Sequence, residues 1–204
     1  YGYLGYQIYQ DKIQEQSLSE RVNQLKSKED YVTLDQISPI YKEAVLESED
    51  RRFYQHGPVD YYGLARAMLT NLTTFSFKEG GLTITQQLSK NLCLSFEKDL
   101  SRKFAEVFIA RDLEKMYNKD EILELYLNTS YFGNGFYSVK SASLGYFNKL
   151  PKDMNDSESI MLAGIPNAPS LYNPIQNKNL AIERQRQVIN KMIKSVSYTH
   201  LTLP

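Results

Sequence analysis

Hydrophobic positions in the middle of the chain recur at the spacing of an α-helix. Leu100, Phe104 and Phe108 stand four residues apart, so their side chains share one face, and the pattern predicts a helix over residues 100–117. A similar pattern predicts a last helix over residues 179–194. Alternation with a period of two, which is typical of a half-buried strand, is scarce. The pattern therefore predicts a mainly α fold.

Two helix starts carry the signature of a capping box, in which a small polar residue is followed three residues later by Glu or Gln. Thr83 with Gln86 forms one, and Asn118 with Glu121 forms the other. After the second box, Ile122 begins an apolar face at helical spacing. We therefore expect helices to begin just after Thr83 and just after Asn118.

The remaining stretches set the expected domain boundaries. We expect residues 1–29 to form a membrane-proximal stalk or linker and residues 30–194 to form the folded domain. Residues 195–204 lack helical periodicity, and we expect them to be a disordered or foreign tail. Within the domain, residues 35–56 indicate a helical stretch that leads into a turn. Residues 61–77 are apolar with a single charge.

Composition limits the class of protein. Hydrophobic residues make up 42% and charged residues 24%, which supports a packed core rather than a disordered chain. The 24 basic and 24 acidic residues give a formal net charge of zero, which argues against a nucleic-acid partner. Because Cys93 is the single cysteine, and His56 and His200 are the two histidines, neither an intrachain disulfide nor a Cys/His zinc cluster can form.

Two features of the sequence concern whether the protein is anchored in a membrane. No stretch approaches the roughly 18 apolar residues that span a bilayer. The chain does not begin with Met, however, so we expect that an N-terminal anchor is missing from it. Residues 1–9 hold four tyrosines. Such a cluster fits a membrane interface and an ordinary amphipathic stretch equally well.

The first candidate for chemistry is the segment Glu49–His56. If it is helical, Glu49, Phe53 and His56 share one face, together with Arg52. A carboxylate beside an aromatic ring and cations can serve as a general base. The spacing alone favours a plainer interpretation by about two to one, namely a solvated helix with local ion pairs.

The second candidate is the segment from Gly80 to Asn91. Two glycines that lead into a helix leave backbone N–H groups able to face an anion, and Lys90 could add a positive charge. The segment is not a Walker loop, because no Gly-Lys-Ser/Thr follows the glycines. A glycine pair before a capped helix is more often just a turn.

The third candidate is Arg102-Lys103 with Glu106. An intrahelical ion pair explains this spacing well. The functional alternative makes the two cations a pyrophosphate clamp and Glu106 a second carboxylate in a cleft.

The order of these motifs resembles that of the peptidoglycan glycosyltransferases, glycosyltransferase family 51, which include monofunctional transglycosylases and the polymerase domains of class A penicillin-binding proteins. The resemblance covers roughly residues 30–194 and rests, in order, on Glu-Asp-x-x-Phe-x-x-His, Gly-Gly-x-Thr-Ile-Thr-Gln-Gln-Leu-x-Lys-Asn, Arg-Lys-x-x-Glu and Lys-Asp-Glu-Ile-Leu-Glu-Leu-Tyr-Leu-Asn. Leu82 departs from the family's usual Ser, which puts one hydrogen bond to the donor substrate in question. Gly57-Pro58 also departs from the pattern of many members, so the turn after His56 is expected to differ.

The resemblance implies a lysozyme-like, two-lobed helical domain whose smaller lobe, with residues 61–77 as part of it, dips into the membrane. It implies polymerisation of lipid II into glycan strands, with inversion at the anomeric carbon and release of undecaprenyl pyrophosphate. It places the chain at the extracytoplasmic face of the cell membrane. The expected partners are lipid II, the growing glycan strand, the membrane surface, and a transpeptidase or other cell-wall protein. Moenomycin, which inhibits this family, is expected to bind.

By motif position, the resemblance makes Glu49 the base that takes the proton of the acceptor 4-hydroxyl, and Glu106 the second catalytic carboxylate. The cations expected to stabilise the leaving pyrophosphate are Lys90, Lys98, Arg102 and Lys103. The other residues at substrate-binding positions are Asp50, Arg52, Phe53, His56, Thr83, Gln86 and Gln87. A divalent cation, Mg²⁺ or Mn²⁺, at the pyrophosphate is compatible with the family, but the sequence shows no dedicated metal cage and assigns no metal ligand.

Two other functions stay open on the sequence. A lysozyme-like glycan-cleaving enzyme would share the fold and a catalytic Glu, but it would not need the anion-binding cations. A non-catalytic membrane scaffold would need neither carboxylate. Loose matches to transpeptidase motifs, such as Ser95–Lys98, run in the wrong chain order and are coincidental.

Overall fold

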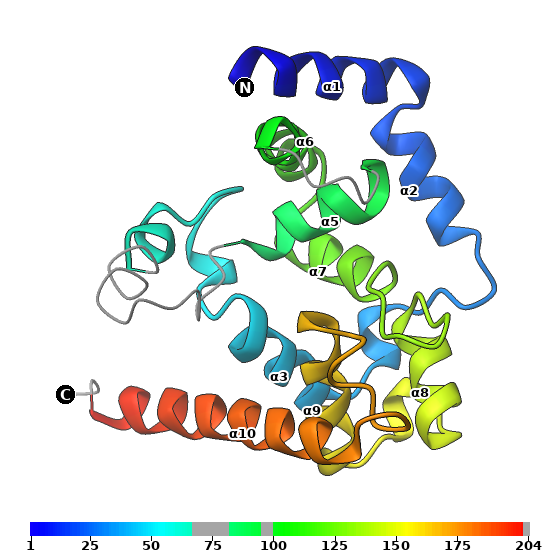
Figure 1. Ribbon diagram of the computed structural model, residues 1–204, viewed down its shortest axis with the longest axis vertical. Helices are drawn as coiled ribbons and strands as arrows, with labels where there is room; N and C mark the ends of the chain where they lie inside the picture. Colours follow the sequence, from blue (N-terminus) through cyan, green and yellow to red (C-terminus); the bar gives the residue numbers. More distant parts are fainter. Residues whose placement is uncertain (67–81, 95–99, 202–204) are drawn as a thin grey trace. The chain divides into compact units, whose positions relative to one another are not determined.

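The computed structural model describes residues 1–66, 82–94 and 100–201, and these residues form helices joined by turns and loops, without a strand among them (Figure 1). The predicted mainly α fold is confirmed. Most of the apolar segment 61–77 lies outside the described residues, although residues 61–66 are helical.

The helices follow one another closely along the chain. In order, they are α1 (Gly2–Glu15), α2 (Leu18–Lys26), η1 (Leu34–Gln36), α3 (Pro39–Glu49), η2 (Phe53–Gln55), α5 (Ile84–Cys93), α6 (Leu100–Met116), α7 (Lys119–Leu127), α8 (Val139–Phe147), η3 (Pro151–Asp153), α9 (Asp156–Gly164), η4 (Ile165–Asn167) and α10 (Lys178–Leu201). The η elements are single turns of 3₁₀-helix.

The chain divides into two compact units, which agrees with the two-lobed, lysozyme-like fold that the resemblance implied. Unit 1 consists of residues 1–24 and 52–126, and unit 2 of residues 25–51 and 127–204. Each unit is therefore assembled from two separate stretches of the sequence.

In unit 1, α5 packs against α6 through fully buried aliphatic side chains, among them Ile84, Ile109 and Leu113. The predicted helix over residues 100–117 is confirmed, but its expected apolar face is not the one that faces this core. Leu100 and Phe104 are 60% and 46% exposed. The buried residues of α6 are instead Ser101, Ala105, Glu106, Ile109, Ala110 and Leu113.

The N-terminal helix α1 also packs on α6. At Gly5, a Cβ atom would lie 2.5 Å from Cβ of Phe104 and 2.6 Å from the carbonyl oxygen of Ser101, so glycine is needed for this close approach. Tyr9 packs against Phe108, with ring centroids 5.7 Å apart. The segment predicted as a stalk over residues 1–29 therefore contains α1 and α2, and its Tyr6 and Tyr9 rings contact Phe108 of α6.

In unit 2, α3, α9 and α10 pack on one another. Tyr41, Leu162 and Val188 are fully buried where these helices meet. Ser38 caps the start of α3 by accepting a hydrogen bond from the N–H of Tyr41. Its hydroxyl also pairs with that of Ser159 on α9, at 3.1 Å.

The last helix, α10, extends beyond the end predicted at residue 194 and runs to Leu201. The Ser195 hydroxyl donates a hydrogen bond to the carboxylate of Glu47, at 2.6 Å, which anchors α10 past the predicted end. That residues 195–204 form a disordered or foreign tail stays a prediction. No helix among the described residues is both long and apolar enough to cross a membrane.

Candidate active site

The residues predicted for the site divide between the two units. Unit 2 contains Glu49 and Asp50. Unit 1 contains Arg52, Phe53, His56, Thr83, Gln86, Gln87, Lys90, Arg102, Lys103 and Glu106. Lys98 and Gly80-Gly81 lie outside the described residues.

The prediction that Glu49 shares a helical face with Phe53 and His56 is wrong. Helix α3 ends at Glu49, and its C-cap, Asp50, has φ −157° and ψ 74°, which is far from helical. The chain then passes from unit 2 into unit 1 at Arg52. The helical spacing was a false signal because the backbone turns immediately after the carboxylate.

Glu49 is held at the C-terminal end of α3 with only 7% of its side chain exposed. The Ser48 hydroxyl donates a hydrogen bond to Oε1 of Glu49, at 3.3 Å. A guanidinium nitrogen of Arg184, on α10, lies 3.8 Å from the same oxygen. Sequence reasoning missed Arg184, because it stands 135 positions later in a helix whose pattern indicated nothing but packing.

Glu106 forms the centre of a charged cluster on α6 in unit 1. Its carboxylate is completely buried, yet Lys103 Nζ lies 2.9 Å and 3.2 Å from its two oxygens, and Arg102 Nε lies 3.4 Å from Oε1. The predicted intrahelical ion pair is confirmed. The Lys103 side chain is 40% exposed, so this cation can also meet an anion from solvent. Whether it does so stays a prediction.

The capping box at the start of α5 is confirmed. Thr83 Oγ1 accepts a hydrogen bond from the N–H of Gln86, and the side chain of Gln86 accepts one from the N–H of Thr83. Thr83 Oγ1 also donates to the carbonyl oxygen of Pro58, at 2.8 Å. The box therefore already uses the N–H of Gln86, one of the donors that a free helix start would offer to an anion.

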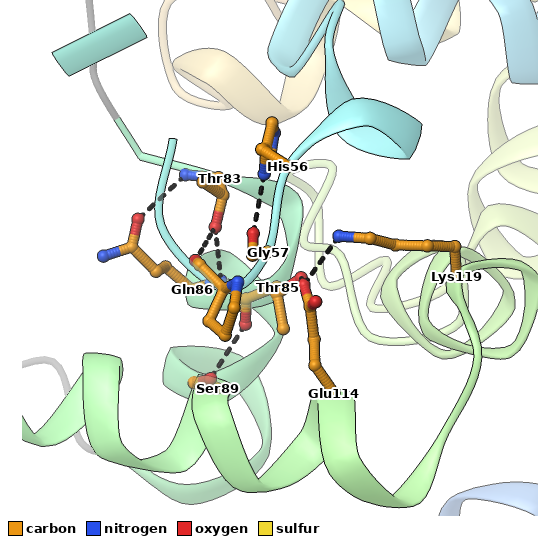
Figure 2. Close-up of polar contacts among 9 residues, drawn as sticks. His56, Gly57, Thr83, Thr85, Gln86, Ser89, Glu114 and Lys119 are labelled. Atoms are coloured by element: carbon orange, nitrogen blue, oxygen red, sulfur yellow. Dashed lines mark hydrogen bonds and ion pairs between the residues drawn. The ribbon is translucent and has the colours of Figure 1, made fainter. Parts of the chain in front are cut away.

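A polar network joins α5, α6 and α7 below this cap (Figure 2). Glu114 Oε1 accepts hydrogen bonds from Thr85 Oγ1 and from Lys119 Nζ, both at 2.7 Å. The ammonium of Lys119 also lies 4.5 Å from the centre of the Phe53 ring. Sequence reasoning did not assign Glu114 to the site, because no short-range spacing links it to Thr85.

Two other predicted residues of unit 1, His56 and Gln87, contact neighbouring groups of the described chain. His56 Nδ1 lies 2.6 Å from the carbonyl oxygen of Gly57, and Gln87 accepts a hydrogen bond from the Tyr126 hydroxyl. Lys90 and Leu82 are half-buried. The role of His56, Gln87 and Lys90 in substrate binding stays a prediction.

A cavity of about 650 Å³ opens in unit 1 next to residues 61–66. Its mostly apolar wall carries two cations, Arg52 and Arg111. Arg52 lies 3.5 Å from the Asp60 carboxylate and stacks 4.5 Å from the centre of the Tyr62 ring. Asp60 lines the same cavity, so the charge of Arg52 is paired there, and the cavity can accommodate an apolar group.

The described residues do not form a protein cage for a metal ion. No group of three or more His, Cys, Asp or Glu side chains with suitable placement occurs among them. The carboxylate of Glu106 is paired with two cations, which makes it a poor ligand for a further positive ion. A divalent cation at the pyrophosphate stays a prediction.

Comparison with known proteins identifies one family and many relatives. A family profile described as transglycosylase matches residues 14–193. Penicillin-binding protein 1A of Neisseria lactamica is 42% identical over 174 residues, which cover 85% of this chain and 22% of that protein. Penicillin-binding protein 1F of Bacillus subtilis is 41% identical over 181 residues, 89% of this chain and 25% of that protein. The chain thus spans about a quarter or less of the length of these curated relatives.

Proposed function

The chain belongs to the transglycosylase family, and we propose that it acts as a peptidoglycan glycosyltransferase domain that polymerises lipid II. In this reaction the 4-hydroxyl of the acceptor sugar attacks the anomeric carbon of the donor. The bond from that carbon to the pyrophosphate breaks, the anomeric centre inverts, and undecaprenyl pyrophosphate leaves with the bonding electron pair.

Glu49 is the proposed general base. A sugar hydroxyl is a poor nucleophile, so a carboxylate must accept its proton as the new bond forms. The position of Glu49 in the family's first motif, and its nearly buried side chain at the end of α3, support this role. After the step the proton resides on the carboxylate of Glu49.

The charged cluster of α6 is the observation that carries the proposal. The departing pyrophosphate gains negative charge, and fixed cations stabilise such charge because they need no reorganisation. A completely buried Glu106 holds Arg102 and the partly exposed Lys103 on one helix. Lys90, on the last turn of α5, is proposed to join them.

The cation cluster of α6 also distinguishes a polymerising enzyme from the two competing functions, a glycan-cleaving enzyme and a scaffold. A glycan-cleaving enzyme has no lipid pyrophosphate to release and therefore no need for this cluster. A scaffold would not need a carboxylate kept at 7% exposure beside a guanidinium. Incubation with finished glycan strands should accordingly give no cleavage products.

We propose that the domain works at the extracytoplasmic face of the cell membrane, because its substrate is lipid-linked. The growing glycan strand and the membrane surface are the partners that follow from this chemistry. A transpeptidase is a further proposed partner, since the relatives are named penicillin-binding proteins.

The direct test is polymerisation of labelled lipid II by the purified chain, with glycan strands separated by gel electrophoresis. We expect polymer from the parent chain and none from Glu49→Gln, because the amide keeps the shape of the side chain but accepts no proton. The circular dichroism of the variant should match that of the parent. Polymer from Glu49→Gln at a rate within a few-fold of the parent would refute the base assignment.

A further inference from the structure

Arg184 connects α10 to the end of α3 within unit 2. Its side chain is almost completely buried, with the residue 7% exposed. One terminal nitrogen donates to the Ser48 hydroxyl at 3.0 Å and lies 3.8 Å from Oε1 of Glu49, while Nε donates to the carbonyl oxygen of Gly164 at 3.4 Å. Arg184 therefore contacts both the proposed base and the residue before it.

The position of Glu49 creates a need for such a cation. The C-terminal end of a helix carries partial negative charge, so a carboxylate there is disfavoured, and burial of the carboxylate adds to the cost. Helix α10 brings two cations to this end. Arg184 faces Glu49, and Lys191 donates to the carbonyl oxygen of Ser48 at 2.9 Å.

Neighbouring residues constrain the position of the Arg184 side chain. A Cβ atom on Gly164 would lie 2.9 Å from Cγ of Arg184, so the glycine leaves room for the arginine stem. The guanidinium stacks 5.5 Å from the centre of the Tyr172 ring and donates to Gln187 at 3.3 Å. A long side chain constrained on several sides loses little further freedom when it pairs with a carboxylate.

We propose that Arg184 is a positioning residue that fixes the carboxylate of Glu49 in the orientation needed to accept the acceptor's proton, without touching the substrate itself. This rests on the proposed function of Glu49. Misplacement of a reacting group by about 1 Å can cost about a hundredfold in rate, so loss of the guanidinium should affect the chemical step rather than substrate binding.

The test compares Arg184→Lys and Arg184→Gln with Arg186→Gln, an exposed arginine on the same helix. For Arg184→Gln we expect kcat to fall at least about tenfold, with the KM for lipid II within about twofold of the parent. Arg184→Lys should recover part of the loss, because the positive charge returns without the planar fork. Arg186→Gln should match the parent. A raised KM with unchanged kcat, or a lysine variant no better than glutamine, would overturn the proposal.

A second measurement does not depend on activity. Thermal unfolding midpoints are compared for the parent, Arg184→Gln, Glu49→Gln and the double variant. If the two side chains are paired, Arg184→Gln lowers the midpoint less in the Glu49→Gln background, because no buried carboxylate is then left without its cation. Strictly additive shifts would contradict the pairing. If the parent chain fails to polymerise lipid II, the proposed function fails, and this cycle still decides whether Arg184 holds Glu49.

Discussion

Glu106 illustrates how a single residue can have a structural and a functional interpretation at once. A carboxylate with no exposed surface is costly unless it is paired, and Lys103 and Arg102 provide that pairing. The same two cations carry the positive charge that the proposed leaving group requires. The structure shows the pairing of Glu106 with Lys103 and Arg102. The binding of pyrophosphate by these two cations is a proposal.

Lys103 allows the two interpretations to be separated. Lys103→Met keeps most of the side-chain stem and removes the charge, and we expect lipid II turnover to fall at least about tenfold, which corresponds to about 1.4 kcal/mol of barrier. Lys115→Met is the matched control on α6, because Lys115 also pairs three residues away, with Asp112. Equal rates for both variants would leave Lys103 with a structural role alone.

At the scale of single elements, the start of α5 depends on its cap. Thr83 satisfies the N–H of Gln86 and also reaches Pro58, so Thr83→Ala should lower the free energy of unfolding by about 1 kcal/mol. Thr83→Ser is the control, since it retains the hydroxyl. Denaturant unfolding of the two variants checks this, and an alanine variant as stable as the serine variant would show that the cap contributes little.

The contact between α1 and α6 should depend on pH. A hydrogen bond from Tyr9 to Asp112, and then burial, raise the pKa of Tyr9 from 10.0 to about 12. The folded chain thus holds this proton more tightly than the unfolded chain does. The resulting stability is fully present below pH 10 and is lost as the pH rises through about 12.

The measurement is the difference in free energy of unfolding between the parent chain and Tyr9→Phe across this range. We expect the parent's advantage to be constant below pH 10 and to shrink between pH 10 and about 12. The phenylalanine variant removes the titrating hydroxyl while keeping the ring packed near Phe108. An advantage that stayed constant through pH 12 would contradict the assignment.

At the scale of the whole molecule, ligand binding offers a test that does not need turnover. Moenomycin resembles a lipid-phosphate-linked glycan and should meet the cations proposed for the donor. At about one hundred times its dissociation constant it should stabilise the folded chain by about 2.7 kcal/mol. Thermal unfolding with and without moenomycin measures this, and Lys103→Met should weaken the shift. An unchanged midpoint at concentrations that stop other family members would count against an intact donor site.

The sequence by itself determined the class of fold, several of the helices, two of their caps and the family. The boxes at Thr83 and Asn118 could be predicted, and both are present, because a cap is made by residues three positions apart. The helix over residues 100–117 was likewise visible, since periodicity is a local property. The motifs that identified the family are also short strings whose order the chain preserves.

Only the tertiary structure decided which faces are buried and which distant residues pair. It ended α3 at Glu49, although helical spacing continued to His56. It buried Ile109 and Leu113 of α6 while it left Leu100 and Phe104 exposed. It also brought Arg184 to Glu49 and Glu114 to Thr85. The physical reason is range: propensity and capping act over one helical turn, whereas burial and charge pairing depend on elements far apart in the chain, whose contacts no local pattern encodes.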